Sequence, residues 1–393
     1  MNCPKAVKKI FAFSFASLVA AAAFAVDFGG SLKNVTSFKG NKFDSLKLDQ
    51  TDDLALWLKV PFTKSGSVYL IAEGLYEFEY DQSQEEAFNR LDLDLFKFSA
   101  KFNLKDGASA NLSAGRFMFS DLTGLIFNQN GDGLYFDYNN SFLSLSAYGS
   151  YTGLLNANLV KMLDAPYDPF DGDAKAVYKP AQKNAVAAAT VSFPRLWQTQ
   201  NLSAQFLGAF KVDSKSLNRM YLSLSLSGPV YKTLYYNASS TLGMLSYNGG
   251  SVELSNLSSL RFSFFFPVKD LTLNLGGLYA SGSNGPFESF MAVTKISAFN
   301  ALDDTAAQHT GLVKGSFSAS IKPLKVLLLY AGCDVILDAA TSSVQYRGFQ
   351  YNAGVDCQIF SDVKIGAGLL QYFDDLNSDN DKVQISLNAL IVF

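Results

Sequence analysis

The sequence has few of the residues from which most catalytic and metal centres are built. Its 393 residues include one histidine and three cysteines. The histidine, His309, falls outside any recognisable nucleophile motif, so catalysis by a serine or cysteine with an oriented base is not expected. The residues therefore predict no enzyme, no catalytic residue and no cofactor.

An acidic stretch from Asp375 to Asp381 has the alternate spacing of a calcium-binding loop. Its sixth position is Asn380, where such a loop has glycine, and its twelfth is Ser386, where a calcium loop has glutamate. We expect a solvated acidic loop here and no dedicated metal site, although weak divalent binding is left open.

Charge is scarce, and long apolar runs are missing after the first 25 residues. Charged residues make up 17% of the chain. Without Lys5, Lys8 and Lys9 there remain 29 Lys and Arg against 35 Asp and Glu, a net charge near −6 that gives no case for a nucleic-acid partner. No run of roughly 18 apolar residues occurs, so no membrane-spanning helix is expected.

The first 25 residues have the organisation of a secretory signal peptide. A basic start is followed by an apolar run from Ile10 to Ala23 and by a small-x-small end at Ala23 and Ala25. We expect cleavage about after Ala25, which leaves residues 26–393 as one domain. Cys3 precedes the apolar run, so a lipoprotein anchor is not expected.

Alternation of apolar and polar residues fills the rest of the chain. In the last stretch, Val383, Ile385 and Leu387 alternate with Gln384 and Ser386. A period of two is typical of a β-strand with one apolar and one polar face. Comparable stretches lie at about 27–38, 54–62, 70–80, 91–102, 108–118, 132–138, 141–151, 184–193, 200–211, 219–228, 232–244, 251–266, 270–281, 311–322, 325–337, 344–359, 362–373 and 382–393. The phase slips near Phe96, which predicts a β-bulge.

The connections between these stretches alternate between short and long. Short connections lie near residues 63–67, 103–107, 139–140, 194–199, 228–231, 267–270, 323 and 361–362. Short turns on one side and longer loops on the other are typical of transmembrane barrels, whose strand number in bacterial proteins is even. We therefore predict an all-β fold, a single transmembrane antiparallel β-barrel of about 18 strands (range 16–18).

A membrane barrel also explains the apolar faces. In a water-soluble protein the apolar faces of so many strands would have to be covered by a second apolar layer. The other face of each strand carries serine, asparagine and glutamine, and no amphipathic helices are available to form such a layer. In lipid, a closed barrel leaves no unpaired edge. Aromatic clusters such as Tyr76 to Tyr80 suit interfacial girdles. A soluble β-helix or adhesive sandwich is the alternative that imitates part of this pattern.

The terminal strand resembles the closing strand of bacterial outer-membrane β-barrel proteins, in which a final aromatic is part of the signal read by the barrel-assembly machinery. The resemblance implies an outer-membrane location, short turns on the periplasmic side, outer-membrane lipid and the assembly machinery as partners, and Phe393, Ile391 and Leu387 as signal residues. The stretch from Gly115 to Tyr138 resembles the Gly-Arg strand end and loop of substrate-selective and alginate-export-like porins, which would place Arg116 near the pore mouth.

Sixteen to eighteen strands leave a water channel, so charged residues on the polar faces are candidates for the pore lining. The candidates are Glu73, Glu77, Arg90, Asp92, Asp94, Arg116, Arg219 and Arg261. Arg90, Asp92 and Asp94 are suited to a charge filter, because opposed charges at a constriction select solutes. The alternative is that wall charges pair with neighbouring strands and keep the lumen wet.

Two loops are long enough to fold into the channel, residues 152–182 and 282–309, and we favour the first by its length; the second contains 287–299, a candidate short helix. The leading hypothesis is a porin-like channel for passive diffusion of small hydrophilic solutes. The alternative is a non-conducting outer-membrane adhesin or structural barrel that acts through its extracellular loops. Trimers are common among porin-like proteins, so a homo-oligomer is an expectation that no residue here decides.

Cys333 and Cys357 fall on neighbouring predicted strands. A hairpin centred near residues 340–341 puts Cys333 opposite about Gly348 and Cys357 opposite about Leu324. The thiols would be about nine residues out of register, roughly 30 Å at strand rise, so we expect no disulfide.

Overall fold

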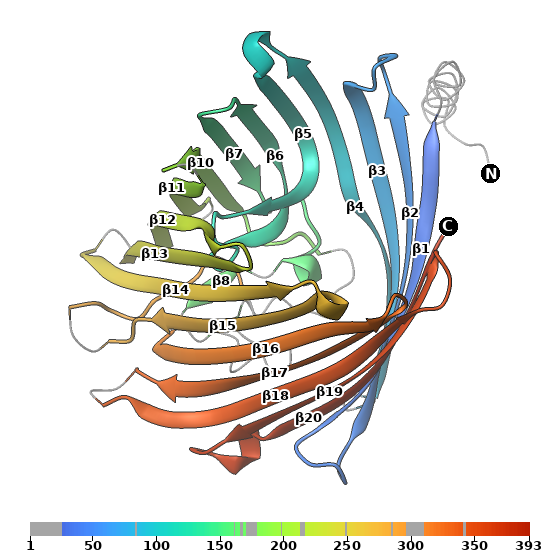
Figure 1. Cartoon of the computed structure of the whole chain (residues 1–393), viewed down its shortest axis with the longest axis vertical. Coiled ribbons are helices and arrows are strands. Elements are labelled where there is room, and N and C mark those ends of the chain that lie inside the picture. The colour runs from blue at the N-terminus through green and yellow to red at the C-terminus, as the bar shows by residue number, and fades with distance from the viewer. Residues whose placement is uncertain are drawn as a thin grey trace.

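The protein is a closed antiparallel β-barrel (Figure 1). The computed structural model describes residues 26–393 except 83–84, 161, 166–167, 170–178, 198, 213–216, 248–249, 284–285, 296–309 and 341–342. In this part of the chain eighteen strands form one sheet, and the pairing of β1 with β20 closes it. The predicted fold class is thus confirmed, and each of the eighteen predicted stretches falls on a barrel strand.

The barrel strands follow the chain order, each pairing with the next, and β7 pairs directly with β10. Their bounds are β1 Asp27–Gly40, β2 Lys47–Pro61, β3 Val68–Asp81, β4 Glu86–Asn103, β5 Ser109–Ser120, β6 Asn128–Asn139, β7 Ser144–Tyr151, β10 Asn184–Leu196, β11 Gln200–Lys211, β12 Leu217–Tyr231, β13 Leu234–Tyr247, β14 Val252–Phe266, β15 Leu271–Ala280, β16 Leu312–Leu324, β17 Leu327–Asp338, β18 Gln345–Gln358, β19 Val363–Asp374 and β20 Lys382–Val392. A separate two-stranded sheet consists of β8 Leu163–Ala165 and β9 Asp168–Pro169.

Short 3-10 turns are the only helical elements in the part of the chain that the structure describes. They are η1 Lys105–Gly107, η2 Ala157–Leu159, η3 Val268–Asp270 and η4 Ser378–Asn380. No helix among these residues is long and apolar enough to cross a membrane.

The period of two in the sequence separates an outer apolar face from an inner polar one. On β12 the outward Leu224 is 52% exposed, whereas the inward Ser223 is 1% exposed and hydrogen-bonds to Thr241 on β13. Large apolar side chains are exposed in the same way on most barrel strands. Such an outer surface suits acyl chains, because water would penalise it and lipid does not.

The predicted bulge is confirmed on β4. Glu73 pairs with Leu95 and Gly74 pairs with Leu93, so one extra residue, Asp94, stands in β4. A bulge moves the following side chains to the other face. The outward residues therefore change from Leu91 and Leu93 to Phe96 and Phe98.

The last residue takes part in closing the barrel. The backbone N–H of Phe393 donates to the carbonyl of Gly30 at 2.9 Å, and the N–H of Gly30 donates back to the carbonyl of Phe393 at 2.8 Å. The side chains of Phe393, Ile391 and Leu387 are exposed on the outer face of this seam. Their role as an assembly signal stays a prediction, and the predicted signal peptide lies outside the described residues.

The two cysteines of the barrel are free thiols, as predicted. Cys333 pairs with Tyr351 and Cys357 pairs with Leu327, so the predicted register was off by three residues. The error arose because alternation locates the strands, whereas no sequence pattern locates the centre of the outer hairpin loop, which sets the register.

Candidate functional site

Three segments from the long-loop side of the barrel fold into its interior and meet there (Figure 1). They are the tip of the β5–β6 hairpin (121–127), the segment 152–163, and the segment 288–294. We call them the inward segments. Their apolar side chains form one buried cluster with residues of β5, β7, β10 to β17 and β19. The members from the inward segments are Ile126, Phe127, Leu155, Val160, Met162, Leu163, Phe290, Met291, Ala292 and Val293.

Both loops that are long enough to fold inward do so in their described parts, including the one favoured by its length. The β5–β6 tip, residues 121–127, was not among the loops predicted to fold inward. The apolar run Leu125 to Phe127 in an outer loop was the available signal. The candidate helix was wrong for its described part, since residues 287–295 contain no helical turn.

Asp121 shapes the tip of the hairpin. Its Oδ1 accepts from the N–H groups of Ile126 and Phe127 at 2.9 and 2.8 Å, and its Oδ2 accepts from the N–H of Thr123 at 2.7 Å. A carboxylate that accepts several backbone N–H groups holds a tight turn without regular secondary structure. The tip is therefore a fixed projection from the wall.

The segment 288–294 joins the other two inward segments. The N–H of Val293 donates to the carbonyl of Ile126 at 2.8 Å, and the N–H of Leu163 donates to the carbonyl of Val293 at 3.0 Å. The hydroxyl of Tyr221 on β12 donates to the carbonyl of Met291 at 2.5 Å. The inward segments thus form one connected body that is fastened to the barrel wall.

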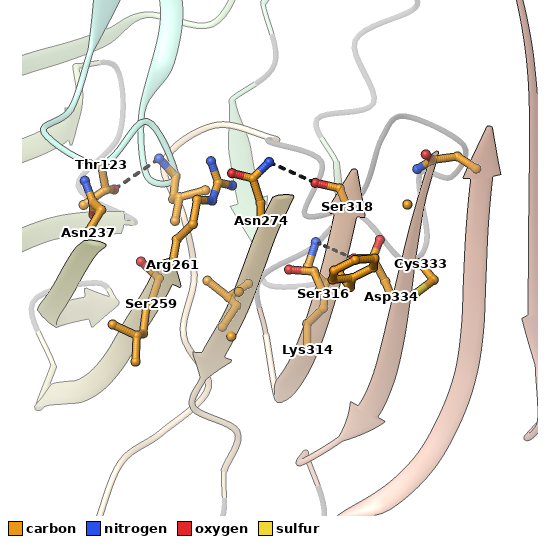
Figure 2. Close-up of a pocket in the computed structure, with 18 residues that line it drawn as sticks. Thr123, Asn237, Ser259, Arg261, Asn274, Lys314, Ser316, Ser318, Cys333 and Asp334 are labelled. Atoms are coloured by element: carbon orange, nitrogen blue, oxygen red, sulfur yellow. Dashed lines mark hydrogen bonds and ion pairs between the residues drawn. The ribbon is translucent and has the colours of Figure 1, made fainter. Parts of the chain in front are cut away.

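A cavity of roughly 500 Å³ lies between the hairpin tip and the opposite wall (Figure 2). Thr123 and Leu125 of the tip border it on one side. The inner faces of β13 to β18 border it on the other with hydroxyl, amide and charged groups, namely Asn237, Ser259, Arg261, Asn274, Lys314, Ser316, Ser318, Asp334 and Asn352. This polar space is the part of the lumen best suited to hold a hydrophilic solute.

Arg261 is the exposed cation of this cavity. Figure 2 shows it between Asn237 and Asn274. None of the described residues makes a hydrogen bond or ion pair with its side chain. The nearby Lys314 has a carboxylate partner, with its Nζ 3.8 Å from Asp334 Oδ1. The guanidinium of Arg261 therefore has donors available to a solute.

A second cavity, of roughly 540 Å³, shares Arg261 and Asn237 with the first. It lies towards the short-turn side and is lined also by Lys232 and by an edge-to-face aromatic pair, Tyr235 and Phe265, with ring centroids 5.6 Å apart. Arg261 thus stands where the two cavities meet.

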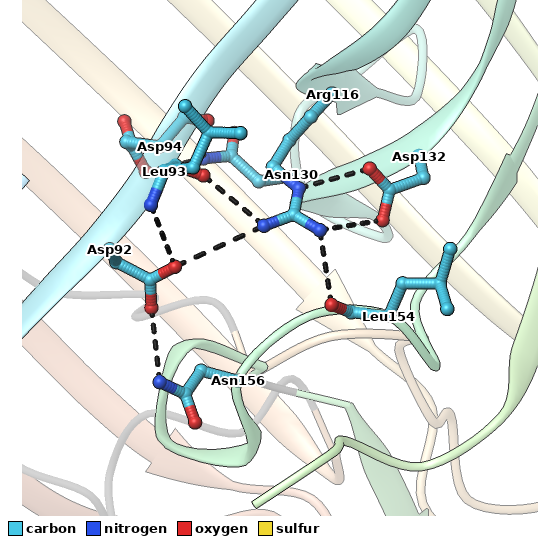
Figure 3. Close-up of polar contacts among 8 residues, drawn as sticks. All are labelled: Asp92, Leu93, Asp94, Arg116, Asn130, Asp132, Leu154 and Asn156. Carbon is cyan, nitrogen blue, oxygen red and sulfur yellow. Dashed lines mark hydrogen bonds and ion pairs between the residues drawn. The ribbon is translucent and has the colours of Figure 1, made fainter. Parts of the chain in front are cut away.

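The predicted pore residues of β3 to β5 form a different arrangement, in which charges pair. Arg116 binds Asp132 with two hydrogen bonds of 2.9 and 3.0 Å, lies 3.9 Å from Asp92, and donates to the carbonyl of Leu154 in an inward segment (Figure 3). Asp92 also accepts from Asn156 of that segment at 3.1 Å. This network fastens the segment 152–163 to the wall.

Gly115 makes room for this network. It has a φ of 120°, and a Cβ at this position would collide with the carbonyl oxygen of Phe96. Only glycine fits such a backbone conformation without strain. The Gly-Arg pair noted in the sequence therefore has a physical basis, in which the glycine allows the close approach of β5 to β4 and the arginine binds Asp132.

Of the remaining predicted pore residues, two pair with each other, and Asp94 and Arg219 have different partners. Arg90 donates to Glu77 at 2.8 Å and is only 5% exposed. Asp94 accepts from Asn130 at 2.8 Å, and Glu73 is half-buried on β3. Arg219 lies beneath the inward segments and does not line the cavity. The sequence did not single out Lys314 or Asp334, since their meeting depends on the register of β16 and β17.

No protein-family model and no curated protein matches the chain. Solved structures match over nearly the whole fold. A BenF-like porin from Pseudomonas fluorescens Pf-5 has a TM-score of 0.66 at 13% identity, covering 94% of this chain and 98% of the porin. Two Pseudomonas aeruginosa proteins are similar at 94% and 98% coverage: OccK2 (OpdF) in complex with glucuronate, with a TM-score of 0.64 and 16% identity, and OpdK with vanillate, with 0.62 and 14%. The chain thus has the fold of porin-like outer-membrane barrels.

Proposed function

We propose that this protein is an outer-membrane channel through which small hydrophilic solutes diffuse passively. The observation that carries the proposal is a polar cavity, bordered by Arg261 and by hydroxyl and amide groups, inside a closed barrel whose outer face is apolar. A barrel of eighteen strands is wide enough to admit water, and fixed polar groups replace part of the hydration of a passing solute. The expected partners are outer-membrane lipid and the barrel-assembly machinery.

Within this function we propose that solutes with a carboxylate are favoured. A guanidinium binds carboxylates through paired hydrogen bonds, and Arg261 has no partner among the described residues. The ligands named for OpdK and OccK2, vanillate and glucuronate, each carry a carboxylate. Their structures share a fold with this chain, and their ligands serve here as probes.

Single-channel recording of refolded residues 26–393 in planar bilayers tests the channel. We expect discrete conductance steps from protein that shows the heat-modifiable gel migration of a folded barrel. The second candidate, an adhesin or structural barrel, is favoured by one observation: the inward segments fill part of the lumen with apolar side chains such as Ile126, Phe127 and Phe290. A folded barrel that stays silent in bilayers would decide for this second function.

A further inference from the structure

Arg219 lies at a place where the barrel wall, the segment 152–163 and the segment 288–294 meet. Its side chain is 2% exposed. Its Nη1 points at three backbone carbonyls, those of Leu163 at 2.7 Å, Ala292 at 3.1 Å and Val293 at 3.4 Å. One guanidinium therefore contacts both long inward segments at once.

From this geometry we infer that Arg219 is a positioning residue that holds the inward segments together and so fixes the width of the channel. This inference rests on the proposed function for its effect on conduction, but its structural part stands on the contacts alone. Direct backbone contact between the two long inward segments includes the hydrogen bond from Leu163 to Val293, and the carbonyl that accepts it is one that Arg219 also contacts.

The hairpin tip depends on the same contacts. Ile126 of the tip accepts from the N–H groups of Val293 and Thr294 at 2.8 and 3.0 Å, next to the carbonyls that Arg219 binds. The tip in turn forms one side of the solute cavity through Thr123 and Leu125. Loss of Arg219 is therefore expected to loosen the segment 288–294 first and then the border of the cavity.

Arginine suits this role because the Nη1 that makes all three contacts lies farther from the backbone than the Nζ of a lysine would. A lysine here would hold its ammonium farther from the three carbonyls. Replacement by methionine keeps a similar apolar stem but removes every donor and leaves the carbonyls of the two segments without their shared partner.

The test measures access to the junction, independently of conduction. Val293 is fully buried, so Val293→Cys is introduced in a background in which both free thiols, Cys333 and Cys357, are alanine. Labelling by a membrane-impermeant, water-soluble maleimide is followed in the folded barrel. We expect Arg219→Met to raise the labelling rate at least about tenfold and Arg219→Lys to raise it less.

Arg261→Met is the matched control, because Arg261 is an inward arginine that contacts none of the inward segments' carbonyls. It should leave the labelling rate unchanged. Should Arg219→Met fail to fold, Arg219→Lys and Tyr221→Phe are measured in its place. Tyr221→Phe removes only the hydroxyl bound to Met291. We expect each of the two to raise the labelling rate a few-fold.

Conductance of the same variants separates this inference from the proposed function. Faster labelling together with larger or noisier single-channel steps supports both. Faster labelling of a barrel that is silent with or without Arg219 supports the positioning role and overturns the channel. A labelling rate that responds to no substitution of Arg219 overturns the positioning role, whatever the conductance.

Discussion

The arginines on the two sides of the barrel interior differ in their partners. On the side of β3 to β6, Arg90 and Arg116 each lie against a carboxylate, Glu77 for the first and Asp132 for the second. On the side of β13 to β17, Arg261 lies among hydroxyl and amide groups and has no ion-pair partner among the described residues. The same side-chain type thus fastens the structure on one side and is available to a solute on the other.

This difference shows that position on the polar face is a weak guide to a role in selection. A paired charge contributes to stability and to the attachment of an inward segment, and it has few donors left for a solute. Four sets of substitutions, beginning with the one of largest expected effect, test the distinction.

The largest effect on stability is expected for Arg90→Met. Arg90 is almost fully buried against Glu77, and breaking such a pair by removing one partner leaves an uncompensated charge. Because Glu77 keeps some exposure, we expect a loss of about 3 kcal/mol in the free energy of unfolding, at the low end for buried pairs. Urea titration of the barrel in lipid vesicles measures it.

The control for this prediction is the double variant Arg90→Met with Glu77→Gln. It removes both charges and should recover a clear part of the loss. An equally unstable double variant would mean that shape, and not charge pairing, governs this part of the wall.

A smaller effect is expected where Lys314 and Asp334 face the cavity. Their charges offset each other at 3.8 Å, so the double variant Lys314→Met with Asp334→Asn should change glucuronate uptake by liposomes less than about twofold, or about 0.4 kcal/mol. Lys314→Met alone should lower uptake more, because it leaves the negative charge of Asp334 unbalanced in the cavity that the carboxylate would enter. If the double variant lost uptake as strongly as the single one, Lys314 would itself be a solute ligand.

A comparable but purely structural effect is expected for the hydroxyl pairs of the polar wall. Ser239 and Ser259 are hydrogen-bonded at 2.8 Å on adjacent strands. Ser239→Ala should reduce the free energy of unfolding by about 0.5–1 kcal/mol, the usual net contribution of a neutral hydrogen bond. Ser259→Ala added to it should cost little more, and full additivity in urea titrations would contradict the pairing.

The barrel itself was predictable from the sequence, and much of its interior was not. Strand number, turns and the bulge follow from the period of two, which is a local property. The hairpin tip at Asp121 and the burial of Arg219 depend on contacts between segments up to about 170 residues apart, such as Asn128 with Thr294. The pairing of Lys314 with Asp334 depends on register, which a shift of a few residues changes.

The central claim, that Arg261 binds a carboxylate solute in the cavity, is tested most directly by the block of single-channel current with glucuronate. The unsubstituted channel should be blocked in a concentration-dependent way, and Arg261→Gln should need about fivefold more glucuronate for the same block, a loss of about 1 kcal/mol. Identical block curves for the two proteins would contradict the assignment of the cavity as the solute site.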